Sequence, residues 1–370
     1  MQFDKQGILY TLIFLGLFIG IHDVQAQQQD EPLDPAGYVT KYDRSFNGIG
    51  PRVYVLPAPR TREELLTDSY KEKIIFQDSI DKALDFQQLV DELRPTSNAP
   101  NMQHLLEPEP SSAQEWNLLV EKEIQRENFS GAYGLLHIYA ESILKKGDVQ
   151  GALNLLQSAL QHAQKTTHTS DIATIQYNLA NVYLFSKNVQ QAGYFQEIYY
   201  KTAIKRESIL DQANALTKIA LIQAYDKDYR SAENNIIRKA IPLINRAKAY
   251  DRKIIAWQTL AKIYQLQNKH TEAQWFLIQA RDLARRRQLT EDLAEIEYML
   301  ASSKFVQKNY KVAKKEFIQA DELAKMEDNR LLRLAIVDKL GQIYMSQSDL
   351  DEAENALSTY QELRNELFQE

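Results

Sequence analysis

Small residues recur at a fixed interval through the C-terminal two thirds of the chain. One series comprises Ala152, Ala192, Ala232, Ala273, Ala313 and Ala353, with successive spacings of 40, 40, 41, 40 and 40. A second series lies 12 positions earlier each time, at Ala140, Ala180, Ala220, Ala261, Ala301 and Gly341. Bulky apolar residues stand beside the small ones at helical offsets, as Leu260 and Tyr264 do around Ala261. A fixed period of this size indicates a repeat array.

The spacing predicts that each unit is an antiparallel pair of helices. Only Ala or Gly fits where two helices cross closely, and bulky residues one turn away fill the grooves between the helices. Short polar stretches such as K-G-D-V and D-K-D-Y separate the two halves of a unit. Because one pair cannot bury its apolar stripe alone, neighbouring pairs must stack. We therefore expect an all-α, right-handed solenoid of about six helix–turn–helix repeats over residues 112–370.

Proline separates this array from the N-terminal region, which holds nine of the ten prolines. Because proline clashes within helices, we expect residues 27–60 to form a mobile linker with a short extended piece at Arg52–Leu56. Residues 95–111 are expected to form a second, proline-rich linker. Between the two linkers, residues 61–94 return to helical spacing. The remaining proline, Pro242, falls within the second helix of the third pair and is expected to kink or end that helix.

Residues 1–26 have the pattern of a cleavable secretory signal. A 14-residue apolar run, Ile8–Ile21, is followed by Val24 and Ala26 at the small-residue positions of a cleavage site. The run is short for a bilayer-spanning helix, which needs about 20 residues. We therefore expect a periplasmic or secreted protein with no stable membrane insertion of the mature chain. An uncleaved anchor remains the alternative, since Asp4 weakens the basic start of the signal.

Charge and composition exclude several classes of partner. The chain has 44 Lys and Arg against 50 Asp and Glu, so its net charge is −6. A mildly acidic chain has no general attraction for nucleic acid, and we expect no nucleic-acid partner. The densest basic run, Arg285–Arg287, is interpreted as the solvated end of a helix, where cations are favoured. Cysteine is absent, which excludes disulfides, thiolate metal sites and a cysteine nucleophile.

Residue patterns that would carry out chemistry are missing. None of the six histidines forms an H-E-x-x-H motif or any pair four positions apart, so no metal site is expected. There is no G-x-S-x-G nucleophile motif. Carboxylate pairs such as Glu63-Glu64 lie in predicted first turns of helices, where they favour the positive end of the helix dipole. We expect a protein without cofactors and without enzymatic activity.

The repeat resembles the tetratricopeptide repeat, whose motif reads W-x2-L-G-x2-Y and then A-x3-F-x2-A. The fourth unit matches nearly throughout, with Trp257, Leu260, Ala261, Tyr264, Ala273, Leu277 and Ala280. The period is 40 residues instead of 34, so we expect each helix to be longer by about one turn. Arrays of this length resemble exported bacterial regulators and the input halves of histidine kinases. The family's carboxylate clamp is not reproduced, because His137 and Glu141 stand where its first Lys and Asn would be.

The resemblance also implies a concave groove lined by the first helix of each repeat. Aromatic and amide side chains at these positions suit an extended peptide or a partner helix. The positions carried over are Tyr177, Asn181, Phe185, Asn214, Tyr225, Gln258, Lys262, Tyr298 and Phe305. The alternative is that Phe185, Tyr225 and Phe305 simply fill the seams between the longer helices.

The leading functional prediction is an exported, non-enzymatic scaffold that binds a protein or peptide in this groove. The proline-bearing N-terminal region would act as a tether or a second contact. The alternative is a periplasmic sensor or input subunit that regulates a membrane histidine kinase or a similar signalling protein, so a membrane protein is among the expected partners. An enzyme of envelope polymers is a distant third interpretation.

Overall fold

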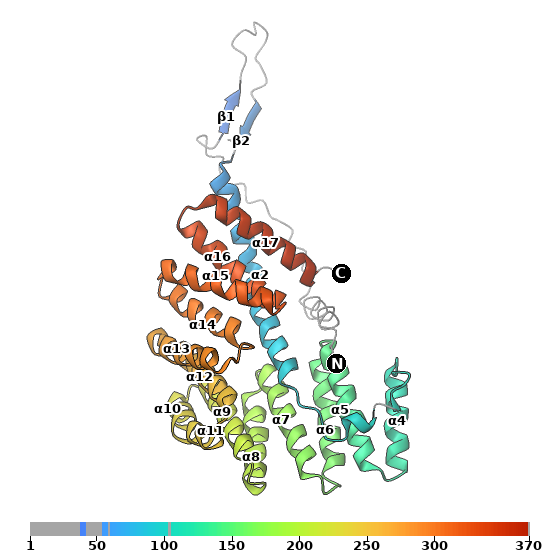
Figure 1. Cartoon of the computed structure of the whole chain (residues 1–370). Helices are drawn as coiled ribbons and strands as arrows, with labels where there is room; N and C mark the ends of the chain where they lie inside the picture. The colour runs from blue at the N-terminus through green and yellow to red at the C-terminus, as the bar shows by residue number, and fades with distance from the viewer. Residues whose placement is uncertain (1–37, 42–53, 58–59, 103–104, 369–370) are drawn as a thin grey trace.

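The computed structural model describes residues 38–41, 54–57, 60–102 and 105–368. The expected signal at 1–26 and most of the expected linker at 27–60 lie outside this part of the chain. Within 27–60, strands β1 (Tyr38–Lys41) and β2 (Tyr54–Pro57) form an antiparallel hairpin in which Tyr38 pairs with Pro57. The hairpin stands apart from the helices (Figure 1). Among the described helices, none combines the length and the apolar character needed to cross a membrane.

Six helix pairs stack into a curved array, which confirms the predicted all-α, tetratricopeptide-like solenoid (Figure 1). The pairs are α5 (Phe129–Lys145) with α6 (Val149–Ala163), α7 (Thr169–Phe185) with α8 (Val189–Lys205), α9 (Ile209–Tyr225) with the run α10 (Tyr229–Asn234), η3 (Asn235–Ala240) and α11 (Ile241–Ala247), α12 (Tyr250–Leu266) with α13 (His270–Arg287), α14 (Leu293–Val306) with α15 (Tyr310–Met326), and α16 (Arg330–Ser346) with α17 (Leu350–Phe368). Both series of small residues are buried at the helix contacts. Helix α4 (Ala113–Gln125) packs on α5 ahead of the first pair.

Most turns between the helices of the array share one backbone geometry, and the turn between α6 and α7 is an exception. After α7, Lys187 adopts the left-handed conformation with φ 59°, and the N–H of Asn188 donates to the carbonyl of Tyr183 at 2.9 Å. This bond closes the end of the helix in the manner of a Schellman motif. Asn188 then begins α8, because its side chain accepts from the backbone N–H of Gln191. Each such turn contains a left-handed residue that ends one helix and an N-cap residue that begins the next. Because these residues recur with the repeat, most helices have the same length.

Of the two outcomes predicted for Pro242, a kink or an end of the helix, the structure shows no end. The chain continues as α11 to Ala247, and the segment before the proline, Asn235–Ala240, winds as a π-helix. Proline lacks an N–H and its ring clashes with the carbonyl four residues earlier, and a wider π turn relieves both problems. The π-helix also falls in the one unit where the spacing of the small residues, from Ala232 to Ala273, is one position wider than in the others. The extra residue is therefore taken up as a local bulge while the stacking of the pairs continues.

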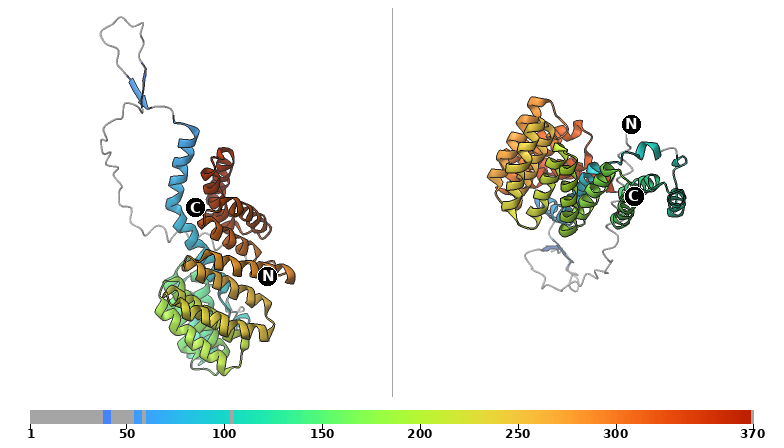
Figure 2. Two further views of the ribbon diagram at one scale, coloured as in Figure 1. Left: turned by 90° about the vertical axis from the view of Figure 1, so that its left-hand side faces the viewer. Right: turned by 90° about the horizontal axis from the view of Figure 1, so that it is seen from below.

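A long N-terminal helix, α2 (Arg62–Glu92), runs along the inner face of the array (Figures 1 and 2). It begins with a capping box between Thr61 and Glu64. It packs against α16 and α17 at one end of the array and against α7 near the other. At about 1.5 Å per residue, 31 residues reach roughly 46 Å, enough to cross several repeats. One face of α2 is buried at helical spacing, at Leu66, Tyr70, Lys73, Ile80, Ala83, Phe86, Leu89 and Val90.

The chain leaves α2 at Leu93 and continues without regular structure before a short helix, α3 (Ala99–Met102), which packs on α5. The segment Leu93–Asn98 is called the linker below. It precedes the array in the sequence, and in space it lies against the second and third repeats. Helix α2 and the linker therefore lie on the concave side of the array.

Candidate functional site

The concave groove predicted from the sequence exists, but the chain's own helix α2 occupies it. Phe86 of α2 is fully buried, and its ring lies 5.6 Å from that of Phe185. The carboxylate of Asp85 lies 3.7 Å from the ammonium group of Lys262. The acidic side chain of Asp81, also on α2, helps to raise the pKa of Tyr298, for which burial is the larger cause. Three of the predicted groove residues therefore face α2.

The other predicted groove residues have different surroundings. Tyr177 and Asn181 are buried beside the linker and α2, while Asn214 and Gln258 are half-buried and make no hydrogen bond within the described part of the chain. Phe305 packs against the rings of two residues on α15, Tyr310 and Phe317, and so fills a seam between helices. For that residue the simpler structural interpretation is correct.

A cleft of about 60 Å³ remains between α2 and the groove wall. Three lysines from successive repeats line it, namely Lys187, Lys218 and Lys262, and Tyr225 lies beside them. Glu92 of α2 accepts from the ammonium group of Lys218 at 2.5 and 2.6 Å. The cleft is thus the contact of an acidic face of α2 with a basic stretch of the groove.

Asn178 on α7 forms hydrogen bonds with the backbone of the linker. Its Oδ1 accepts from the N–H of Arg94 at 3.0 Å, and its Nδ2 donates to the carbonyl of Arg94 at 2.8 Å. The same Nδ2 lies 2.7 Å from Nε2 of His137, which is fully buried on α5. Burial lowers the pKa of His137 to about 4, against an opposing effect of the Asp171 carboxylate. A paired amide of this kind recognises extended polypeptide without regard to its side chain.

Asp171, in the first turn of α7, holds the linker at a second point. Its carboxylate accepts from the backbone N–H of Ser97 at 2.7 Å and from the Ser97 hydroxyl at 2.8 Å. It also accepts from the hydroxyl of Tyr133 on α5 at 2.5 Å. Burial, followed by this hydrogen bond, raises the pKa of Tyr133 to about 12, so the phenol stays protonated and remains a donor.

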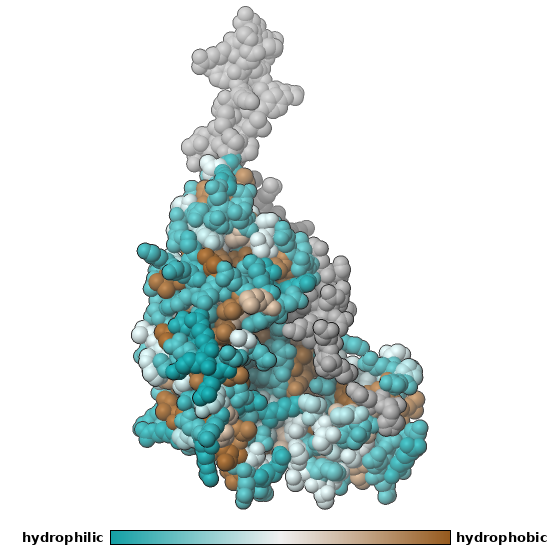
Figure 3. Space-filling view, in the orientation of Figure 1, coloured by the Kyte–Doolittle hydropathy of each residue, from teal (hydrophilic) through white to brown (hydrophobic). Residues whose placement is uncertain are grey.

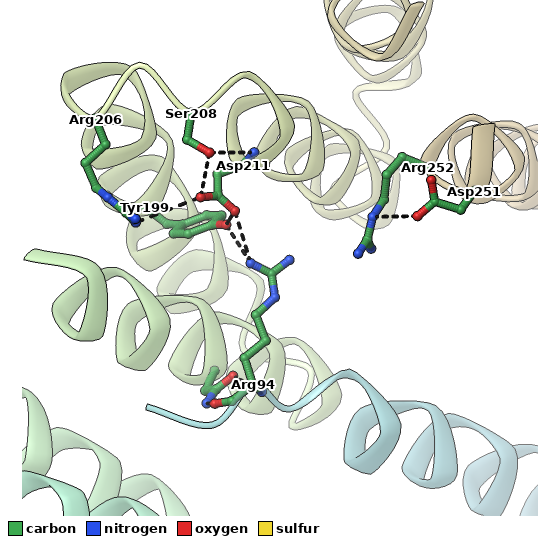
Figure 4. Close-up of polar contacts among 8 residues, drawn as sticks. Arg94, Tyr199, Arg206, Ser208, Asp211, Asp251 and Arg252 are labelled. Carbon is green, nitrogen blue, oxygen red and sulfur yellow. Dashed lines mark hydrogen bonds and ion pairs between the residues drawn. The ribbon is translucent and has the colours of Figure 1, made fainter. Parts of the chain in front are cut away.

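The side chain of Arg94 enters a third contact, shown in Figure 4. Its guanidinium carbon lies 3.8 Å from the centre of the Tyr177 ring, and Nη1 donates to the hydroxyl of Tyr199 at 2.7 Å. Nη1 also lies 3.4 Å from Oδ1 of Asp211, in the first turn of α9. An aromatic face, a hydroxyl and a carboxylate together suit a planar cation.

The charge of this pocket is consistent with a cationic occupant. Burial alone would raise the pKa of Asp211, but hydrogen bonds from Tyr199 and Ser208 and the charges of Arg94 and Arg206 outweigh burial and lower the pKa. Asp211 is therefore ionised at neutral pH. Burial likewise raises the pKa of Tyr199, which keeps its proton and donates to Asp211 at 2.6 Å.

The other end of α2 is anchored separately. The hydroxyl of Tyr70 donates to the carbonyl of Ala353 at 2.7 Å. The ammonium group of Lys73 lies 3.1 Å from Asp338 and 4.1 Å from the centre of the Tyr360 ring, and both charged residues are buried. Burial lowers the pKa of Lys73, against the attraction of Asp338. Removing one member of such a pair leaves an uncompensated buried charge, so this contact fixes α2 on the last repeat.

Sequence reasoning missed the polar residues that hold the linker. Asn178, Asp171 and Asp211 lie on first helices of repeats, but a first-turn Asp is expected for the helix dipole alone. Asn178 and Asp171 are distinguished by being polar and fully buried, which hydrophobic periodicity does not reveal, and Asp211 is only partly buried. In the described residues no group of His, Cys, Asp and Glu could hold a metal ion. The face seen in Figure 3 is mostly hydrophilic, with apolar side chains in small separate patches.

No protein-family model matches the sequence, and no curated protein matches it. Solved structures do match. A Rap protein complexed with competence and sporulation factor has a TM-score of 0.52 and 16% identity, over 83% of this chain and 78% of that one. Aspartyl phosphate phosphatase F from Bacillus subtilis has a TM-score of 0.50 and 12% identity, over 83% of this chain and 76% of that one. A STAND signal transduction ATPase with a tetratricopeptide repeat sensor from Pyrococcus horikoshii has a TM-score of 0.50 and 15% identity, over 84% of this chain and 54% of that one. The shared feature is the arrangement of helices, and this chain has a tetratricopeptide-like helical repeat fold.

Proposed function

We propose that this chain is a non-enzymatic scaffold whose concave groove binds a protein or peptide partner, and that the partner takes the place of the linker Leu93–Asn98. The observation that carries the proposal is the pairing of Asn178 with both backbone groups of Arg94. A groove that holds a polypeptide backbone in this way can hold another extended segment by the same hydrogen bonds.

The linker is easier to exchange than α2. Fully burying a large apolar side chain stabilises by about 1.5–3 kcal/mol, and the five buried at Leu66, Ile80, Phe86, Leu89 and Val90 amount to on the order of 10 kcal/mol. The linker is held mainly by hydrogen bonds, each with a net contribution of about 1 kcal/mol. A partner peptide would restore those bonds one for one, while nothing would replace the burial of α2. Helix α2 therefore stays in place in this proposal and forms one wall of the site.

Two further observations support a regulatory role for the scaffold. One of the solved structures with this fold is a Rap protein complexed with competence and sporulation factor. Within this chain, α2 connects the linker site on the second repeat to α16 and α17 at the last. The second candidate, an input subunit of a membrane histidine kinase or a similar protein, uses this connection to pass on peptide binding. In both candidates the signal at 1–26 exports the protein to the periplasm or the medium.

Peptide binding tests the proposal directly. The probe is a fluorescent peptide with the sequence of Glu92–Ala99, and the protein is the full chain carrying Arg94→Ala and Ser97→Ala. These changes weaken the binding of the linker to the groove. They are needed because the linker is part of the same chain, so its effective concentration at the groove is higher than that of any free peptide that competes with it. We expect the loosened chain to bind the probe at least tenfold more tightly than the wild-type chain, measured by fluorescence anisotropy.

Adding Asn178→Ala to the loosened chain should then abolish most of this binding. The matched control is Asn214→Ala, which removes a groove amide one repeat further along that makes no hydrogen bond to the linker. If the Asn178 and Asn214 variants bind the probe equally, or if no variant binds it, the groove does not act as a peptide site.

A further inference from the structure

The cleft between α2 and the groove wall collects cationic side chains from three successive repeats. Lys187 follows α7, Lys218 lies on α9 and Lys262 lies on α12. Two carboxylates of α2, Asp85 and Glu92, complete the charged part of the lining. Three ammonium groups against two carboxylates leave the lining with one unbalanced positive charge, and a concave site with an excess of one sign of charge attracts an ion of the other sign.

Both lysines on the inner wall are charged at neutral pH. Burial would lower the pKa of Lys218, but the attraction of Glu92 and the hydrogen bond to it outweigh burial and raise the pKa. Burial would likewise lower the pKa of Lys262, but nearby acidic groups, among them Asp85 and Glu295, outweigh burial and raise the pKa. Glu295 is exposed and does not line the cleft.

The charged groups of the cleft are unequally paired. Glu92 accepts from the ammonium group of Lys218 at 2.5 and 2.6 Å. Asp85 lies 3.7 Å from the ammonium group of Lys187 and 3.7 Å from that of Lys262, and both distances are too long for a hydrogen bond. A ligand between these three groups could therefore accept from the two lysines and donate to Asp85 without breaking a hydrogen bond between them.

Asn181 adds a donor that has no partner. Its side chain lines the cleft from α7 and is only 5% exposed. In the described part of the chain, nothing accepts a hydrogen bond from its buried Nδ2. Buried donors without a partner are rare in folded proteins. The amide therefore indicates a ligand at this wall of the cleft, independently of the charges.

The size of the cleft and the directions of its donors favour a small tetrahedral oxyanion. A volume of about 60 Å³ corresponds to roughly four to six water molecules at about 10–15 Å³ each. The donors lie on separate elements, and a tetrahedral oxyanion offers four oxygens to them where a carboxylate offers two. The ammonium group of lysine binds phosphate as a point charge, so it does not require the planar geometry that arginine recognises.

We propose that the cleft binds inorganic hydrogen phosphate. Lys187, Lys262 and the amide of Asn181 donate to its oxygens, and Asp85 accepts its one proton. Sulfate and the dianion of a phosphate monoester have no proton to donate, so each would place a charged oxygen against the carboxylate. Bound phosphate joins α2 to the second and fourth repeats. The site uses none of the contacts of the linker, so it goes beyond the proposed peptide binding and does not depend on it.

Isothermal titration calorimetry of the full chain at pH 8 and constant ionic strength tests the site with three anions: phosphate, sulfate and glycerol 3-phosphate. At this pH the monoester, with a second pKa of about 6, is fully ionised, while inorganic phosphate keeps one proton. We expect phosphate to bind at least about tenfold more tightly than the other two, because only phosphate can donate to a charged acceptor. Equal binding of the three anions, or no binding of phosphate, would overturn the proposal.

Protein variants assign the effect to the cleft. Lys262→Gln should weaken phosphate binding about tenfold and Lys187→Gln about threefold or more, since the Lys187 side chain is 72% exposed. Lys308→Gln is the matched control for Lys187→Gln, because Lys308 occupies the same left-handed position three repeats further along and does not line the cleft. We expect that control to bind phosphate as the wild type does. Equal losses in the Lys187 and Lys308 variants would contradict the proposed site.

Asp85→Asn tests the basis of the selectivity. The amide can donate to a fully ionised oxyanion, so sulfate should bind this variant within about twofold of phosphate. Lys187 is largely exposed and Asp85 is 40% exposed, so both variants should fold as the wild type does. If the Asp85 variant still preferred phosphate tenfold over sulfate, the carboxylate would not be the group that receives the proton.

Discussion

The ring of Tyr70 on α2 lies directly against the backbone of Gly341 on α16. A Cβ atom built at Gly341 would come within 2.7 Å of the Tyr70 ring carbon Cε1. All five other residues in this series of small positions are alanines, and the glycine falls in the repeat that receives Tyr70. The missing methyl group is therefore explained by the docking of α2, and not by the crossing of the two helices of the pair.

Gly341→Ala should consequently destabilise the protein. In an open helix the same change stabilises by about 1 kcal/mol, because glycine is a poor helix former. Here the added methyl group meets the Tyr70 ring, and overpacking of this kind typically destabilises by about 1–3 kcal/mol. The measurement is chemical denaturation, together with hydrogen exchange along α2, which should lose protection first near Tyr70.

Gly193→Ala is the matched control. Gly193 also lies inside a helix, α8, and the nearest heavy atom to an added Cβ would be Ile222 Cγ2 at 3.7 Å, an ordinary van der Waals contact. We expect that variant to be as stable as the wild type or more stable. If both glycine variants were stabilised alike, Tyr70 would not be packed on Gly341 in solution.

The contact between Tyr70 and α16 also shows which parts of the fold could be predicted from the sequence. The small-residue series at Ala180, Ala261 and the other positions predicted the repeat and the paired helices, because close helix crossings leave a periodic trace in one sequence. Helical spacing in 61–94 predicted helical structure there, and α2 occupies most of that range. Its position in the groove could not be predicted, since Tyr70 and Ala353 are 283 residues apart and no periodicity connects them.

The π-helix at Asn235–Ala240 carries the one extra residue of the third repeat. Deleting Arg238, an exposed residue in this segment, together with Pro242→Ala should restore the spacing of the other repeats and a regular α-helix. The proline must be replaced at the same time, because a regular turn would bring its ring against the carbonyl four residues earlier. We expect the double change to preserve cooperative unfolding, with a free energy of unfolding within about 1 kcal/mol of the wild type.

Deletion of Glu197 is the control for this prediction. Glu197 is an exposed residue in the middle of α8, the regular α-helix at the same place in the second repeat. Removing it turns the rest of the helix by about 100° and takes the buried Tyr199 and Ala203 out of the core. That variant should be strongly destabilised. If both deletions were equally damaging by thermal unfolding, the π turn would not be the place where the extra residue is absorbed.

The linker site shows why the candidate site was harder to predict than the fold. Of the residues predicted to line the groove, Tyr177 does contact the linker, through the guanidinium group of Arg94. Asp171 and Asp211 could not be singled out from the sequence, because a first-turn carboxylate has the same sequence pattern whether it faces water or a ligand. Their role depends on the path of Leu93–Asn98, which is set by contacts between distant parts of the chain.

His137 gives the linker site a pH dependence. The backbone N–H of Arg94 can only donate, so the oxygen of Asn178 must face it and Nδ2 must face His137. Nε2 of His137 therefore accepts a hydrogen bond, which requires a neutral ring. Protonation would place two donors face to face and break the pairing of Asn178 with the linker.

The free energy of unfolding should fall as the pH drops from about 6.5, the ordinary pKa of histidine, towards about 4, the pKa of His137 in the folded chain. Above this window both states are neutral and the residue has no effect. Within it the unfolded chain binds a proton that the folded chain does not, so stability is lost at up to about 1.4 kcal/mol per pH unit.

Denaturant unfolding of the wild type and of His137→Gln between pH 7.5 and pH 4.5 measures this contribution, because glutamine can accept from Asn178 and does not titrate. All other groups titrate in both proteins, so the difference between the two curves isolates His137. We expect the wild type to lose more stability than the variant on acidification, and parallel curves would mean that His137 is not buried as a neutral acceptor.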